Sequence, residues 1–414
     1  MAAAYEELNA LAGADVSLAS LWRHDEAPAL LAAMRAREPV HYCRASPFGP
    51  YWSVTRHADI VRTELRTASF SSSYAFGGIT IFGDQASPAD ELLPMFIAMD
   101  GSAHAGARRT IAPALGPSEL DRLEPELRRR TAALIDSLPV GEPFDWLDRV
   151  AIELTTGMLA TLLDFPFEER RRLGFWSDWA GDIEAARDPV LGRRRMEVLR
   201  ECGRRFLQLK RQRKALGLRP DLVSRMIHSA SMGAAPPREY LGHLVLLIIG
   251  GNDTTRSTIA ALPMVNRLFP GEWRRIADRP LLVANAVQEL ARWQTPIAHM
   301  RRTASQDCEI GGRAIRAGEK VVMWYASANR DEEMFVDAER FVADRPNARR
   351  HLSFGAGVHR CLGARLAHLQ VSALFEALLE RGLAPIQCGP AERTPSSFIH
   401  GFRRMPARLV RASA

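Results

Sequence analysis

The amino-acid sequence predicts a mainly α-helical fold with a small β component, and three observations support that fold class. Apolar residues make up 47% of the 414 residues and charged residues 25%, which is typical of a globular protein. No low-complexity linker or repeat divides the chain, so a single domain is expected. Long stretches with apolar residues about 3.6 positions apart outnumber short alternating ones.

Seven stretches carry the apolar spacing of an amphipathic helix, and several of them begin near a proline, serine or aspartate. They cover residues 118–138, 148–164, 166–186, 191–216, 238–269, 281–293 and 363–381. Four short β-branched or alternating pieces predict strands, at residues 51–56, 301–305, 308–315 and 319–327. The longest loops are expected at residues 69–94, 232–237 and 329–350.

Charge and cysteine content exclude several classes of protein. The net charge is +7, but the basic residues are scattered among acids, which argues against a nucleic-acid partner. The N-terminus lacks the pattern of a signal peptide, and no apolar run reaches the length of a membrane span, so a cytoplasmic protein without integral membrane association is expected. The five cysteines are far apart and form no Cys-x-x-Cys pair, which disfavours disulfides and zinc sites.

One cysteine stands at the mouth of a predicted helix. Cys361 follows a glycine-rich loop and precedes the helical stretch 363–381. A thiolate at a helix N-terminus is stabilised by the free amide groups and the helix dipole, which suits a metal ligand or a nucleophile. Gly355 and Gly363 would let the backbone lie close to a flat ligand, and Phe354 could cover the sulfur. The alternative is a small buried hydrophobic cysteine.

The string "FGAGVHRCLGARLA", residues 354–367, resembles the haem-thiolate signature of the cytochrome P-450 family. The resemblance extends over nearly the whole chain, and it implies a triangular, helix-rich prism. Haem b, iron protoporphyrin IX, would lie between a long distal helix and the helix of the cysteine loop. Cys361 would be the axial ligand of the iron, with Phe354, Gly355 and Gly363 against the cofactor. Gln370 stands where the family usually has glutamate.

The resemblance also implies side chains for the two haem propionates. His359, His104, Arg108 and Arg301 match family positions that hydrogen-bond these anions. Arg302 is an equal neighbour of Arg301, and the sequence does not choose between them. Each of these residues alone could equally be an exposed basic residue on a helix face.

The tetrad Glu289-Leu-Ala-Arg292 places a carboxylate and a guanidinium on one helix face. Such tetrads usually decorate a surface, but the distance from the cysteine loop matches the buried Glu-Arg network of the family. Glu289 and Arg292 are therefore expected to stabilise the fold and the haem pocket.

The apolar stretch 241–262 is interrupted by Gly250-Gly251 and by the polar run Asn252 to Thr255, which costs helix stability and often marks a bulge or kink. In the family this helix crosses the distal haem face. The resemblance makes Asp253 and Thr254 the catalytic pair that organises water and delivers protons during dioxygen activation. The alternative is a plain helix-capping run.

These parts imply a monooxygenase that uses dioxygen, and other strings refine the substrate. Segments such as "GGITIFGD", "FIAMD" and "ARWQTPIAHMRRTA" resemble the soluble bacterial alkane and fatty-acid ω-hydroxylases. That resemblance implies hydroxylation of the terminal carbon of medium-chain linear substrates. A steroid or terpenoid monooxygenase is the alternative of the same kind, and a haem-binding sensor without turnover is the alternative from another class.

Terminal attack requires a narrow apolar tunnel, because a methyl C–H bond is stronger than a methylene C–H bond. By family position the tunnel is expected to be lined by Ile79, Ile81, Leu246, Ile249, Gly250, Ile297, Met300 and Phe398.

Electrons are expected from other proteins, because the 53 residues after Cys361 (414 − 361) are too few for a reductase domain. Residues 1–414 are therefore expected to be one haem domain with no fused reductase and no membrane anchor. The resemblance implies a [2Fe–2S] ferredoxin and a flavoprotein ferredoxin reductase that pass electrons from NAD(P)H. Arginines near the cysteine loop could form the docking surface; they are Arg349, Arg350, Arg360 and Arg365.

Overall fold

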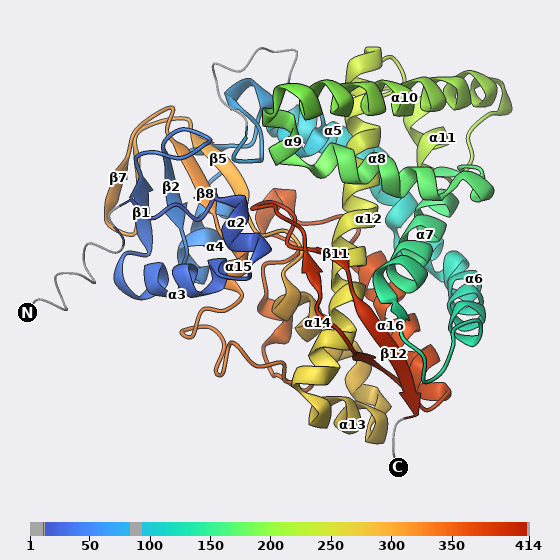
Figure 1. The fold of residues 1–414 in the computed structure, drawn as a ribbon. Helices are drawn as coiled ribbons and strands as arrows, with labels where there is room; N and C mark the ends of the chain where they lie inside the picture. Colours follow the sequence, from blue (N-terminus) through green and yellow to red (C-terminus); the bar gives the residue numbers. More distant parts are fainter. Residues whose placement is uncertain (1–10, 12, 83–92, 412–414) are drawn as a thin grey trace, which may run out of the picture.

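The computed structural model describes residues 11, 13–82 and 93–411. Helices make up most of it, and the strands form small sheets, the largest of them at one side of the helices (Figure 1). The predicted fold class is confirmed. Within the described residues, no helix is long and apolar enough to cross a membrane.

All seven predicted helices are present. The stretches correspond to α6 (Pro117–Asp136), α7 (Glu153–Leu163), α8 (Arg171–Gly181) with α9 (Ile183–Arg187), α10 (Pro189–Arg213), α12 (Pro237–Leu268), α14 (Val283–Gln294) and α16 (Ala364–Glu380). The stretch 166–186 is split at Asp182, whose carboxylate accepts hydrogen bonds from the backbone of Glu184 and Ala185. This N-cap starts α9 as a separate short helix.

Shorter helices were not predicted, because one to three turns carry too few apolar positions to show a helical period. They are α2 (Ala19–Arg23), α3 (Ala27–Arg37), α4 (His57–Leu65), α5 (Gly101–Ile111), α11 (Leu222–Ile227), α13 (Pro270–Asp278) and α15 (Tyr325–Ala328).

The largest sheet has the strand order β1-β2-β8-β5-β3. Its strands are β1 (Val40–Cys43), β2 (Tyr51–Val54), β3 (Phe70–Ser71), β5 (Met300–Ala304) and β8 (Lys320–Met323). The antiparallel pair β5 and β8 sets Arg301 opposite Val322 and Arg302 opposite Val321. A second sheet contains β4 (Phe144–Asp145), β12 (Pro406–Arg411) and β9 (Leu383–Gln387). Two further sheets have two strands each: β6 (Cys308–Ile310) pairs with β7 (Arg313–Ile315), and β10 (Glu392–Arg393) pairs with β11 (Phe402–Arg404). Strands are present in all four predicted regions, but residues 325–327 of the last region belong to a helix, Tyr325–Ala328.

Helix α12 runs through the middle of the molecule and contacts helices from both halves (Figure 1). Its 32 residues span about 48 Å. It is buried over most of its length, and Trp146 donates from its indole to the carbonyl of Ile259 at 3.0 Å. The helix is continuous through Gly250-Gly251, where the sequence predicts a bulge or kink. The polar run after the glycines is accommodated by bonding partners on other helices.

The Glu289–Arg292 pair on α14 lies at the centre of a buried network. Both side chains are fully buried, and they form a two-pronged ion pair at 2.7 and 2.8 Å. Arg345 adds a second cation at 2.8 Å from Glu289, while Arg292 also donates to the carbonyls of Asn329 and Ala338. This network ties the long segment after β8 to α14, which packs against α12 and α16.

Candidate functional site

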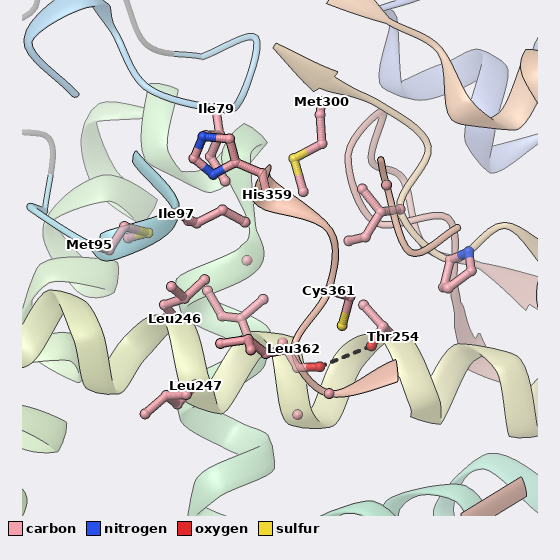
Figure 2. Close-up of a pocket in the computed structure, with 18 of the residues that line it drawn as sticks. Ile79, Met95, Ile97, Leu246, Leu247, Thr254, Met300, His359, Cys361 and Leu362 are labelled. Atoms are coloured by element: carbon pink, nitrogen blue, oxygen red, sulfur yellow. Dashed lines mark hydrogen bonds between the residues drawn. The ribbon is translucent and has the colours of Figure 1, made fainter. Parts of the chain in front are cut away.

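A cavity of about 340 Å³ lies between α12 and the cysteine loop. Figure 2 shows Cys361 of the loop and Thr254 of α12 facing the same space. Apolar side chains line the rest of this space. Residues far apart in the sequence therefore meet around one internal space.

Cys361 is held by its loop with the sulfur directed into the cavity. Its amide donates to the carbonyl of Phe354 at 2.8 Å, and α16 begins at Ala364, as the sequence predicts. Cys361 is exposed, and it lines the cavity. Burial raises the pKa of the thiol, opposed by the Gly363 amide and the charge of Arg108. A bound cation is needed for this sulfur to be a stable thiolate.

Glycines in the loop make the approach possible. Gly355 and Gly357 have φ of +65° and +62°, which side chains rarely adopt. A Cβ at Gly357 would lie 3.0 Å from the backbone oxygen of Glu64, and one at Gly363 would lie 3.8 Å from the Cys361 sulfur. The backbone thus stays flat against the cavity where the sequence expects a planar ligand.

A basic cluster lines the cavity beside Cys361. It consists of His104 and Arg108 from α5, Arg302 from β5, and His359. The rings of His104 and His359 are 4.2 Å apart, and Arg108 donates to the carbonyl of Arg360 at 2.6 Å. The Nδ1 atom of His359 is buried and has no hydrogen-bond partner among the described residues. Burial and the charges of Arg302, His104 and Arg108 lower the pKa of His359 to about 3.

These features fit haem. The Arg108 guanidinium and the buried, unpartnered Nδ1 of His359 are groups that suit an anion, and haem carries two propionates. The cysteine sulfur faces α12 across the cavity, and a Cβ at Gly250 of that helix would meet nothing within 4 Å. A flat group bounded by the sulfur, the helix and the basic cluster therefore matches the residues present.

Arg301 was expected to hold a propionate, but it does not line the cavity. Its guanidinium donates to the carbonyls of Phe76 and Gly77 and to the Thr303 hydroxyl. Arg302 lines the cavity instead and forms an ion pair with Glu64 at 2.8 Å. Neighbours on a strand point to opposite faces, and the sequence alone could not say which face of β5 meets the cavity.

Thr254 lines the cavity, and its hydroxyl donates to the carbonyl of Gly250 at 3.0 Å. Asp253 is buried on the other side of α12 and does not line the cavity. Its carboxylate accepts hydrogen bonds from Ser177 at 2.8 Å and Asn252 at 2.9 Å. The two members of the predicted pair are therefore in different surroundings.

Asp253 is linked to the protein surface through a charged chain. Arg256 lies 3.0 Å from Asp253 and 2.6 Å from Asp178, whose side chain is 56% exposed. Burial raises the pKa of Asp253 to about 6, against the lowering effect of Arg256. Gly181 lines the cavity, and a Cβ there would lie 3.1 Å from the second oxygen of Asp253, so the carboxylate lies just behind the cavity wall.

The apolar part of the cavity contains seven of the eight expected tunnel residues. They are Ile79, Leu246, Ile249, Gly250, Ile297, Met300 and Phe398. Ile81 was a wrong prediction: it is fully buried in the core around the largest sheet. Residues 79–81 form no regular strand, so Ile79 and Ile81 need not share a face, and the Ile81 amide instead donates to His299.

Several lining residues were missed by the sequence analysis. Figure 2 shows Met95, Ile97 and Leu247 around the apolar part. The segment 93–98 is almost entirely apolar, and that pattern could have indicated a buried wall. Arg195 and Glu64 are also at the cavity, and no local pattern distinguishes them from the many other charged residues.

Comparisons with known proteins agree with this geometry. The family model described as "Cytochrome P450" matches residues 266–382. Linalool 8-monooxygenase from Pseudomonas putida is 34% identical over 391 residues, 92% of this chain and 95% of that protein. Methyl-branched lipid omega-hydroxylase from Mycobacterium tuberculosis is 29% identical, covering 95% and 94%. The solved structure of cytochrome P450-153 from Novosphingobium aromaticivorans is 47% identical with a TM-score of 0.90, covering 95% of this chain and 99% of that chain.

Proposed function

The chain belongs to the cytochrome P450 family of haem-thiolate monooxygenases, and from that premise we propose that it hydroxylates the terminal carbon of medium-chain fatty acids and n-alkanes. The observation that carries the proposal is the apolar part of the cavity, which shares one space with Cys361 and Thr254. Support also comes from the likeness to a protein named as an omega-hydroxylase.

We assign the haem contacts as follows. Cys361 holds the iron, with Phe354, Gly355 and Gly363 close to the cofactor. His104, Arg108, His359 and, in place of Arg301, Arg302 hold the propionates; all four line the cavity. When bound, haem b supplies the activation of dioxygen that inserts one oxygen atom into a C–H bond.

Protons would reach the cavity through the two faces of α12. Asp253 takes a proton from the surface side, where Arg256 and the exposed Asp178 form the link to solvent. Its raised pKa lets the carboxyl carry that proton near neutral pH. The Thr254 hydroxyl, on the cavity side, then orients the water that delivers it.

The position of the substrate chain in the cavity would decide which of its carbons reacts. A methyl C–H bond is stronger than a methylene C–H bond by a few kcal/mol, so a freely tumbling chain would react at interior carbons. Leu246, Ile249 and Phe398 narrow the space and would present only the chain end to the reacting centre.

Electrons would come from a [2Fe–2S] ferredoxin and its flavoprotein reductase, with residues 1–414 as one catalytic domain. Docking on the cysteine side would use exposed basic residues complementary to an acidic partner. These are Arg349, Arg350, Arg360 and Arg365.

A spectral titration of the ferric holoenzyme tests the substrate class. The panel contains a C8–C12 alkane and fatty-acid series, linalool and a steroid, followed by product analysis of the best binders. Terminal alcohols from linear chains are expected. Linalool belongs in the panel because a protein of that specificity is 34% identical, and preference for linalool or the steroid over every linear chain would overturn the proposal. Binding without any turnover would favour a sensor.

A further inference from the structure

Three arginines line the cavity, and they lie in two different places. Arg108 and Arg302 belong to the basic cluster beside His359 and Cys361. Arg195 comes from α10, which crosses the first half of α12 (Figure 1). The haem contacts account for the first two cations and leave Arg195 without an assigned role.

Arg195 is oriented but lacks a counterion. Its Nε and Nη2 atoms donate to the carbonyls of Trp179 and Ala180 at 3.0 and 2.9 Å, at the end of α8. No carboxylate lies within ion-pair distance of it in the described part of the chain, and Nη1 bonds to no described residue. Burial lowers the pKa of Arg195, opposed by the charge of Asp182.

Two neighbouring arginines do have partner acids. Arg172, on α8, pairs with Glu169 and Glu201, and Arg205, on α10, pairs with Glu169. A half-buried cation without a partner acid is costly unless an anion from elsewhere joins it. The cavity that Arg195 lines is the place from which such an anion can come.

Aliphatic side chains line the cavity near Arg195. Ala180, Leu199 and Val245 pack together there, with Met196 and Ile249 against them. Arg195, these side chains and Cys361 therefore border one cavity.

We propose that Arg195 binds the carboxylate of a fatty acid whose methyl end reaches the cysteine end of the cavity. This inference rests on the proposed function and names its preferred substrate class, fatty acids over n-alkanes. The free Nη1 atom supplies charge-assisted hydrogen bonds to the carboxylate, while the two α8 carbonyls fix the plane of the guanidinium.

The test compares three substrates of one chain length: dodecanoate, its methyl ester and dodecane. Spectral dissociation constants and terminal-alcohol yields are measured for the holoenzyme and for Arg195→Gln. Losing charge-assisted hydrogen bonds should weaken dodecanoate binding about 10-fold or more. Dodecane and the ester should change less than about twofold, since neither carries a charge for the guanidinium to bind.

Two further variants separate binding from other effects. Arg193→Gln makes the same charge change at an exposed site on α10 and should leave all three substrates unchanged. Arg195→Lys keeps the charge and should recover part of the dodecanoate affinity. Equal losses for dodecanoate and dodecane in Arg195→Gln would mean that Arg195 only supports α8, and unchanged dodecanoate binding would also overturn the inference.

The outcome is distinguishable from a failure of the proposed function. If the unmodified enzyme forms no terminal alcohol from any linear chain, the proposed function fails. If it forms terminal alcohols but Arg195→Gln treats acid and alkane alike, only the carboxylate site fails.

Discussion

The two ends of the cavity are assembled in different ways. At the cysteine end, most of the contacts expected for the cofactor come from one stretch, residues 354–363. At the far end, the lining comes from segments spread over the chain, at residues 79–82, 93–98, 180–199, 245–250, 297–300 and 398. The chemistry of the iron side is therefore local in sequence, whereas selectivity for the substrate depends on tertiary structure.

The two ends of the cavity should therefore respond differently to single substitutions. A local motif fails when one residue is altered, because its few side chains act on one atom. An apolar wall shared by many segments changes gradually, because each side chain contributes only part of the surface.

The largest effect is expected at Cys361. Replacing the proposed iron ligand by Cys361→Ser should lower product formation about 100-fold or more, equivalent to about 2.7 kcal/mol. The ferrous–carbon monoxide spectrum should lose the thiolate signature at the same time. Cys388→Ser, at a partly buried cysteine that does not line the cavity, is the matched control and should leave both unchanged. Retained activity in Cys361→Ser would contradict the assignment.

His351 is expected to make the cysteine end sensitive to acid. It is buried next to Phe354, with ring centres 5.2 Å apart, and burial lowers its pKa to about 3. Because the unfolded chain binds the proton first, the stabilisation is complete above about pH 6.5 and decreases as the pH falls toward 3. The loss should be about 2 kcal/mol at pH 5.

Urea unfolding of the holoenzyme at pH 7 and pH 5 measures this effect. His351→Gln, which does not titrate, should lose less stability between the two pH values than the unmodified protein. The other buried histidines are the same in both proteins. An equal loss in both would show that His351 does not titrate on unfolding as predicted.

Thr254→Ala is expected to uncouple electron use from product formation. Without the hydroxyl that orients water in the cavity, product per NAD(P)H consumed should fall about 10-fold while NAD(P)H consumption continues. Thr254→Ser keeps the hydroxyl and should restore most of the coupling. Full product formation by the alanine variant would rule out this role.

The smallest effect is expected in the apolar wall. Ile249→Ala or Leu246→Ala should widen the tunnel and raise the share of ω−1 and ω−2 alcohols about 3-fold, which needs only about 0.7 kcal/mol. Gas chromatography of the alcohols measures the ratio. Leu268→Ala, at the exposed end of α12, is the control. An unchanged ratio in both tunnel variants would argue against a tunnel at this wall.

The sequence predicts the helices well where the apolar period is long. The 32 residues of α12 and the 25 of α10 repeat their pattern over many turns, and tertiary packing agrees with it. The four-residue helix α15 carries no such repeat. The cysteine loop could also be predicted from the sequence, because its signature consists of the spacing of neighbouring residues.

The rest of the site depends on which way side chains point. Ile81 and Arg301 have suitable chemistry and lie close to the cavity in sequence, yet they face away from it. Arg195 is one of many arginines in a basic chain, and only the folded protein shows that it lines the cavity while two backbone carbonyls hold its guanidinium. Such facts come from tertiary geometry and not from local pattern.

The pairing of β5 with β8 sets the polarity of the cavity wall. Arg302 faces the cavity and Arg301 faces the loop at Gly77, and the two would exchange places if the ladder slipped by one residue. The register of β5 therefore decides which of the two arginines lines the cavity. A change in the length of the connection between these strands therefore has to preserve their register. A shift by one residue would turn Arg302 away from the cavity although the sequence of the strand stayed the same.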